Sequence, residues 1–184
     1  MLRHVKRMPR TAGVLVWTAG AVATYAVVPF ELSRLGDRAR PQGPAASAAR
    51  GAGLLTVTAG AALMAWAMAT HYQAAPRGWA LDSQLTPAYL LRRGPYRFSR
   101  NPIYAGEAIV WLGWALYYRH PAVWAGLVIQ CAGVAVIARW EEHQLLTRFG
   151  ASYQDYLNQV PRWAPRPPSR QRPDDASRPR LDTP

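Results

Sequence analysis

The sequence predicts an all-α membrane protein, a helical bundle of about four transmembrane helices followed by a short cytoplasmic helical segment. Half of its 184 residues are hydrophobic, and they gather in long apolar runs. Several runs approach the roughly 20 residues that an α-helix needs to cross a bilayer. Arginine-rich stretches separate the runs and give a formal net charge of +12. A nucleic-acid-binding domain would share this charge but would not need the runs, so we expect no nucleic-acid partner.

Four apolar runs are the predicted transmembrane helices: residues 11–30, 51–70, 103–118 and 121–138. Pro121 suits a helix start, and only Arg119 and His120 separate it from the preceding run. We therefore expect the last two helices to form a hairpin. Gly106 and Gly113 lie two turns apart in the third run, where small residues let helices approach closely in lipid. A signal peptide is the alternative for the first run.

The basic residues predict an orientation for these helices. The N-terminus, the connection between the second and third runs, and the tail after the fourth run are all arginine-rich. Four crossings place these three regions on one side of the membrane, which the positive-inside rule makes the cytoplasmic side. We therefore expect both termini in the cytoplasm. The connection 31–50 carries four arginines of its own, offset by Glu31 and Asp37, and counts against this orientation.

The chain after the fourth run divides into a helical part and a tail. Residues 139–160 have the spacing of amphipathic helix, and Gly150 is the predicted end of one helix before a second short one. Residues 167–184 are rich in proline and arginine, which is typical of disorder. The membrane domain is therefore expected over residues 1–166. The single cysteine, Cys131, and the scattered histidines predict no metal site.

The densest polar stretch, residues 92–107, leads into the third run. Pro102 opens the helix there, and the free N–H groups of a helix start suit an anionic ligand group. Glu107 lies about one turn inside the apolar run, where an ionisable side chain usually faces a polar cavity or partner. Glu141 and Glu142 follow the fourth run directly, so a hairpin would bring them to the same membrane depth. The stretch is therefore either one wall of a polar pocket or an interfacial loop whose arginines contact lipid phosphates.

A sulfonium cofactor, S-adenosylmethionine, has the groups that such a pocket would bind. Its ammonium and ribose hydroxyls match carboxylates, and its own carboxylate matches an arginine or a helix start. Methyl transfer is an in-line displacement that asks the protein mainly for positioning. No Ser/His/Asp or Cys/His arrangement for nucleophilic catalysis is recognisable in the sequence, which agrees with this chemistry.

Several short motifs, taken together, resemble the isoprenylcysteine carboxyl methyltransferase and phospholipid methyltransferase superfamily of integral membrane methyltransferases. They are residues 94–97, 100–106, 141–142, 149–150 with Tyr153 and Tyr156, and 160–162. The resemblance covers about residues 90–165 and implies S-adenosylmethionine bound on the cytoplasmic side. The positions that it implies for cofactor binding are Asn101, Pro102, Tyr104, Glu141, Glu142 and Tyr153. We expect Arg100 and Glu107 to be the catalytic residues.

The acceptor would approach from the membrane, as a lipid-like amine, a prenyl-cysteine-like carboxylate or a small thiol. A lipid amine must lose a proton before methylation, and Glu107 would then serve as the base. Many relatives have a histidine before the proline where this chain has Asn101, which cannot titrate near neutral pH. Two alternatives stay open. One is an NADPH-dependent membrane reductase resembling the sterol reductases, which share the Asn-Pro-x-Tyr-x-Gly-Glu pattern of residues 101–107, and the other is a non-catalytic membrane scaffold.

Overall fold

The computed structural model describes residues 19–36, 41–74 and 89–163, and all regular structure in these ranges is helical. The elements in chain order are the π-helix η1 (Ala23–Val27), α2 (Val28–Leu32), α3 (Pro44–Ala74), the 3-10 helix η2 (Gly94–Arg97), α4 (Pro102–Tyr118), α5 (Pro121–Phe149) and α6 (Ala151–Gln159). The predicted all-α class is confirmed. The basic N-terminus and the predicted disordered tail, residues 167–184, lie outside the described residues.

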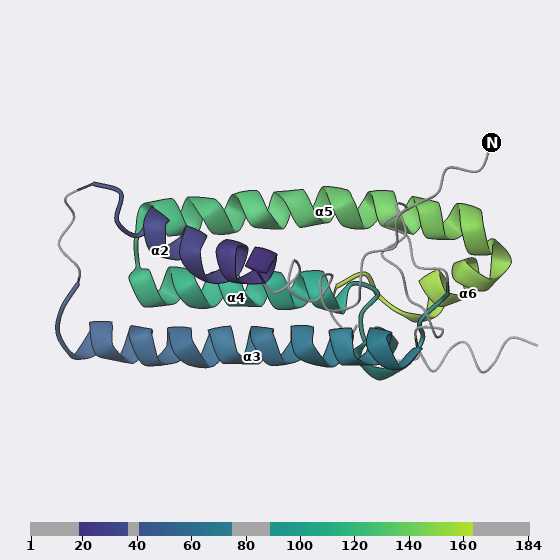
Figure 1. Cartoon of the computed structure of the whole chain (residues 1–184), viewed down its shortest axis with the longest axis horizontal. Helices are drawn as coiled ribbons and strands as arrows, with labels where there is room; N and C mark the ends of the chain where they lie inside the picture. The colour runs from purple at the N-terminus through teal and green to yellow at the C-terminus, as the bar shows by residue number, and fades with distance from the viewer. Residues whose placement is uncertain (1–18, 37–40, 75–88, 164–184) are drawn as a thin grey trace, which may run out of the picture.

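The long helices lie side by side, and successive helices run in opposite directions (Figure 1). Helix α4 lies between α3 and α5, and α2 packs against both α4 and α5. Helix α6 folds back at the end of α5, where α3 ends and α4 begins (Figure 1). This arrangement brings the polar stretch before α4 and the pair of glutamates late in α5 to the same end of the bundle.

Two helices are long and apolar enough to cross a membrane by length and composition: α3 contains an 18-residue stretch with a mean hydropathy of 1.6, and α5 contains one with 1.9. Helix α4 has 17 residues, and at 1.5 Å per residue it extends about 26 Å. The hydrocarbon core of a bilayer is about 30 Å thick, so α4 is slightly short of it. Of the first predicted span, residues 11–18 lie outside the described residues, and the rest lies in the apolar helix Ala19–Leu32. A bundle of four spans therefore stays a prediction.

The two long helices extend beyond the predicted apolar runs. Helix α3 begins at Pro44, within the stretch that the sequence assigns to a connection. Proline suits the first helical position, and the alanines that follow have the highest helix propensity, so the helix starts before the apolar run does. Helix α5 continues past residue 138 to Phe149, and Gly150 ends it with a φ of 53°. The hairpin between α4 and α5 and the helix end at Gly150 are both as predicted.

Large apolar side chains of α3 and α5 point away from the bundle. Leu55 is 75% exposed and Ile129 is 73% exposed, and Val128 and Val136 are exposed to a similar degree. Soluble monomeric proteins rarely expose large continuous apolar patches to water. These outward faces therefore fit an environment of lipid chains.

Glycines allow α3 and α4 to pack backbone against backbone. A Cβ atom added to Gly60 would lie 2.7 Å from the carbonyl oxygen of Gly106 and 2.8 Å from the nitrogen of Val110. A Cβ atom added to Gly53 would lie 2.7 Å from the carbonyl oxygen of Gly113. Because these neighbours are backbone atoms, a side chain has no room at either position. The close-packing role expected of Gly106 and Gly113 is confirmed, and α3 supplies their glycine partners.

Pro29 leaves a backbone carbonyl free in the first helix. It has no N–H to donate to the carbonyl of Tyr25, four residues earlier, so that α-helical hydrogen bond is missing. The indole N–H of Trp114 donates to this carbonyl instead and ties α4 to the first helix. The π-helical turn η1 surrounds Tyr25, and such turns are frequent at functional sites.

Candidate functional site

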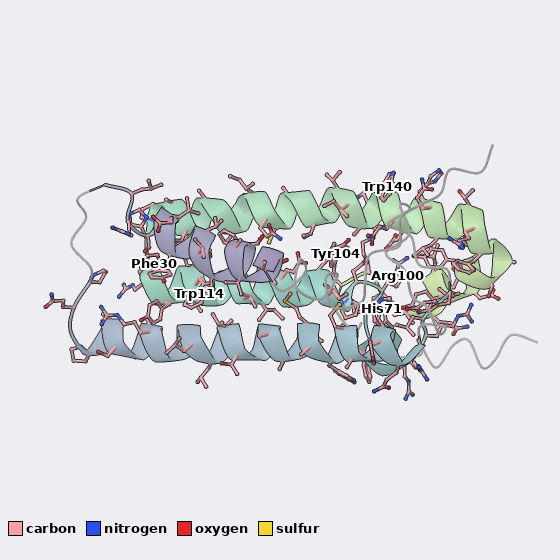
Figure 2. All side chains as sticks on the ribbon, viewed as in Figure 1. Phe30, His71, Arg100, Tyr104, Trp114 and Trp140 are labelled. Atoms are coloured by element: carbon pink, nitrogen blue, oxygen red, sulfur yellow. The ribbon has the colours of Figure 1, made fainter. Side chains whose placement is uncertain are left out.

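Glycine and proline shape the chain that enters α4. Gly94 starts η2 with a φ of 59°, a left-handed conformation that favours glycine. Pro102 is buried at the first position of α4, directly after the buried Asn101. Figure 2 shows Arg100 and Tyr104 toward the end of the bundle where α6 lies. Local backbone preferences therefore present the polar side chains at this end.

The segment after α6 returns to the start of α4, and we call its residues 160–162 the C-terminal strap. The backbone N–H of Arg100 donates to a strap carbonyl at 3.0 Å. The Ser99 hydroxyl and the Asn101 amide nitrogen donate to the carbonyl oxygen of Arg162 at 3.1 and 3.2 Å. The strap is therefore attached to the start of α4 by three hydrogen bonds.

Both carboxylate oxygens of Glu142 are engaged by neighbouring side chains. Its Oε1 accepts from Arg162 Nε at 3.0 Å and from Asn101 Nδ2 at 3.3 Å. Its Oε2 accepts from Arg162 Nη2 at 2.7 Å and lies 3.5 Å from Arg100 Nη1. A bidentate pair of this kind is among the stronger polar contacts in proteins. The hydrogen bonds to Glu142 also raise the pKa of the Arg162 guanidinium above its usual value.

Glu141 has a different partner because adjacent helical residues point about 100° apart. The hydroxyl of Tyr104 donates to its Oε1 at 2.7 Å. Among the described residues, none donates to its Oε2. Arg100 Nε is buried and likewise has no hydrogen-bond partner in the described part of the chain. The site therefore offers one carboxylate oxygen and one guanidinium N–H to a ligand.

Glu107 lies about one turn beyond Tyr104, deeper in the bundle. It is 8% exposed and accepts a hydrogen bond from Gln130 Nε2 at 2.9 Å, and the hydroxyl of Tyr25 is a second neighbour of the carboxyl group. The three side chains come from α4, α5 and η1. Both of these neighbours of the carboxyl group are neutral.

Helix α6 is held against this end by two buried tyrosines. Tyr153 is 1% exposed and packs with Tyr156 and Val160, against partly buried Leu145 and other apolar side chains. The Tyr156 hydroxyl donates to the carbonyl of Tyr96 at 2.7 Å. Burial raises the pKa of both tyrosine hydroxyls, so they stay protonated. Tyr153 thus lies in an apolar cluster that positions α6, and its role in cofactor binding stays a prediction.

The structure brings most of the predicted site residues together at the α6 end, in two neighbouring sets of contacts that we call the polar network. Arg100 and Asn101 contact Glu142, and Tyr104 contacts Glu141. Pro102 shapes the helix start beneath them, and Glu107 belongs to a separate, deeper set of contacts.

Three partners in these networks are not foreseen from the sequence. Gln130 carries a recognisable signal, because a polar side chain is unusual inside an apolar run. Arg162 lies in one of the resembling motifs, but its ion pair depends on the chain returning after α6. The sequence does not mark Tyr25 as a site residue, since an aromatic residue fits a lipid-facing helix as well as it fits a polar site.

A hollow of about 220 Å³ lies beside the strap. Its lining residues are Arg97, Phe98, Leu157, Asn158, Gln159, Val160 and Pro161. Phe98 is 50% exposed and directly precedes Ser99, which donates to the strap. This hollow therefore lies against the strap, and the residues of the polar network do not line it.

Comparison with known proteins gives a family and one curated relative. A family model described as phospholipid methyltransferase matches residues 49–152, which is more than half of the chain. Methanethiol S-methyltransferase 2 of Bradyrhizobium diazoefficiens is 36% identical over 89 residues, or 46% of this chain and 32% of that protein. The match thus spans about a third of the relative's length. No solved structure matches the chain.

The matched range contains α4, α5 and most of α3, and it includes the whole polar network but not the strap, to which Arg162 belongs. The resemblance seen in the short motifs is therefore confirmed by a model that covers most of the helical bundle. The apolar outward faces of α3 and α5 agree with a membrane protein. This chain belongs to the phospholipid methyltransferase family.

Proposed function

We propose that this protein is an integral membrane methyltransferase that uses S-adenosylmethionine, with its site at the end of the bundle where α4 begins. The observation that carries the proposal is the meeting of Asn101 and Tyr104, at the start of α4, with Glu141 and Glu142 from α5. Family membership supports the reaction class. When bound, the cofactor supplies a methyl group on a positively charged sulfur atom.

The chemistry of the site fits the polar parts of this cofactor. The buried Arg100 Nε, which has no partner among the described residues, fits the carboxylate of the cofactor's amino acid part. The Oε2 atom of Glu141 fits an ammonium group or a ribose hydroxyl. The hydrogen bond from Tyr104 holds that carboxylate in place. These three side chains would hold the cofactor.

We assign a positioning role to Glu142. Its oxygens are occupied by Arg162, Asn101 and Arg100, and so it joins the start of α4, helix α5 and the strap. Catalysis by proximity requires that such a set of groups be held still, because small displacements are costly in rate. Glu142 would therefore act through Asn101 and Arg100 rather than on a ligand.

We infer that the acceptor is a lipid-like amine that enters from the membrane side. The carboxyl group of Glu107 has two neutral neighbours, Gln130 and Tyr25, and no basic partner among the described residues, which fits a cationic ammonium group. The carboxylate would take one proton from the ammonium. The freed nitrogen lone pair would then form a bond to the methyl carbon while the bond from that carbon to sulfur breaks, with S-adenosylhomocysteine as the leaving group. A small thiol is the second candidate, because a methanethiol S-methyltransferase is among the similar proteins. A thiol needs less help from a base, since its pKa is about 8.5.

We also propose the four-span arrangement with the α6 end in the cytoplasm. The alternating directions of the helices support it, because successive connections then lie at opposite ends of the bundle (Figure 1). The slightly short α4 fits this arrangement if the polar residues that precede it lie at the interface.

The test is transfer of a labelled methyl group from S-adenosylmethionine by the detergent-purified protein. The acceptors compared are phosphatidylethanolamine, a prenylated cysteine and methanethiol. Label on the lipid amine is the expected result. Label on the thiol alone would keep the methyltransferase and overturn the amine assignment. Label on none, without NADPH consumption, would favour the scaffold alternative, and NADPH-dependent reduction of a sterol would favour the reductase.

A further inference from the structure

The opposite end of the bundle contains a second hollow, of about 200 Å³. It forms where the start of α3 meets the end of α4 and the turn into α5, and its lining residues are Pro41, Ala46, Arg50, Tyr117, Tyr118 and Arg119. Figure 2 shows Trp114 and Phe30 toward this end, far along the bundle from Arg100. The hollow is therefore separate from the proposed methyl-transfer site.

Two arginines give this hollow a positive charge. Arg50 is half-buried, and its Nη2 donates to the carbonyl of Pro41 at 2.9 Å. Among the described residues, no carboxylate lies within ion-pair distance of Arg50 or Arg119. Glu31, at the same end, pairs with Arg34 at 3.7 Å. A guanidinium group is planar, with five N–H donors, and matches the oxygens of a phosphate group well.

The backbone at Arg119 indicates that its side chain is used. Its φ of 51° and ψ of 31° are left-handed, and it is the one described residue other than glycine with a positive φ. Glycine adopts this conformation without strain, so an arginine here keeps a strained backbone. The turn between α4 and α5 does not need a positively charged side chain at this position, whereas a binding site for an anion would need one.

The aromatic residues around the hollow set its depth in the membrane. Trp114, Tyr117 and Tyr118 contact one another with ring centroids 5.0 to 5.7 Å apart. Tyrosine and tryptophan gather at the level of lipid headgroups, where phosphates lie. Arginines at this end run against the positive-inside rule for the proposed orientation, and an anionic ligand would account for them.

We propose that this hollow binds the phosphate of an anionic phospholipid headgroup in the leaflet opposite the α6 end. Arg50 from the wall and Arg119 from the turn would bind the phosphate oxygens, with the aromatic cluster against the glycerol and upper chains. The proposal does not depend on the methyltransferase activity, since it concerns the other end of the protein.

The test uses the full chain in phosphatidylcholine nanodiscs with and without phosphatidylglycerol, and compares melting temperature and lipid retention by native mass spectrometry. The site variant is Arg50→Gln with Arg119→Gly, which also removes the strained backbone. The matched control is Arg139→Gln with Arg148→Gln, two exposed arginines at the other end. We expect phosphatidylglycerol to bind wild type and control about tenfold more tightly than the site variant, as for a lost charge-assisted contact.

Each outcome bears on the proposal. Equal retention of phosphatidylglycerol by wild type and site variant overturns it, and so does equal loss in the site variant and the control. Inorganic phosphate is added in a parallel arm. If it raises the melting temperature of wild type as phosphatidylglycerol does, and not that of the site variant, the phosphate site stands and its lipid source is overturned. If the site variant melts far below wild type without any lipid, the single variant Arg50→Gln is compared instead, and undiminished binding by the folded Arg50→Gln variant contradicts the proposal.

Discussion

At the scale of single residues, the side-chain amide of Asn101 donates to two acceptors at once. Its Nδ2 donates both to Glu142 Oε1, at 3.3 Å, and to the carbonyl of Arg162, at 3.2 Å. An amide NH₂ group carries two hydrogens and can serve both acceptors. A neutral histidine has only one N–H. The residue therefore fits its neighbours through donor geometry, and its inability to titrate is no disadvantage for this task.

Replacing Asn101 by aspartate should destabilise the protein more than replacing it by histidine. Aspartate removes both donated hydrogen bonds and adds a negative charge beside Glu142, whereas histidine keeps one donor. We expect Asn101→Asp to lower the free energy of unfolding by about 1–3 kcal/mol, measured by denaturation in detergent. Asn158→Asp, at an exposed position of α6, is the control. Equal effects of the two aspartate variants would show that Asn101 has no such role.

Glu107 carries the prediction for the acceptor. Glutamine keeps the shape of the side chain and can still accept a hydrogen bond from Gln130, but it cannot take a proton. We expect Glu107→Gln to slow methylation of an amine by roughly 10²-fold or more while binding of S-adenosylhomocysteine is unchanged. Glu31→Gln, at the end of the bundle opposite α6, should leave both measurements unchanged. Unaltered turnover in Glu107→Gln would remove Glu107 from the mechanism.

At the scale of helices, the α3–α4 contact depends on missing side chains. We expect Gly60→Ala to cost about 1–3 kcal/mol of stability, because the new methyl group would overlap backbone atoms of α4 and force the helices apart. Gly133→Ala in α5 is the matched control, since nothing lies within 4 Å of its added Cβ. That variant should be neutral or slightly stabilising, because alanine favours helix over glycine. Equal melting temperatures for the two variants would contradict the tight contact.

The helices themselves are largely predictable from the sequence, and their ends are less so. Apolar runs and prolines identify α4, α5 and their hairpin, because length, hydrophobicity and helix-start chemistry agree there. The start of α3 at Pro44 is not foreseen, since an alanine-rich segment can be helical without being apolar enough to read as a span. The contact between Tyr25 and Glu107 is also not foreseen, because it depends on how the first helix packs and on the carbonyl freed by Pro29.

At the scale of the whole molecule, the candidate site is predictable only in part. Glu141 and Glu142 can be placed near the start of α4 once the hairpin is assumed, because the hairpin sets their depth. Because the two glutamates are adjacent, the sequence does not say which of them points toward a ligand. In the structure Arg162 pairs with the carboxylate of Glu142 and not with that of Glu141. This ion pair forms only because the chain returns along the strap after α6.

The four-span arrangement predicts opposite sides for the two ends of the bundle. The test introduces single cysteines, Ser47→Cys or Gln154→Cys, in a Cys131→Ala background. Both positions are exposed. Three crossings separate them if α4 spans, so an impermeant maleimide should label Ser47→Cys in intact cells and Gln154→Cys only after permeabilisation. If α4 did not cross, both cysteines would be labelled from the same side.

The measurement that tests the central claim most directly is calorimetric binding of S-adenosylhomocysteine to the purified protein, with NADPH as the competing ligand. The comparison is between wild type, Glu141→Gln and the control Glu31→Gln. We predict that S-adenosylhomocysteine alone binds, and that Glu141→Gln weakens binding by about tenfold, the loss of one charge-assisted contact. Binding of NADPH instead, or undiminished binding of S-adenosylhomocysteine by Glu141→Gln, would contradict the proposed cofactor site.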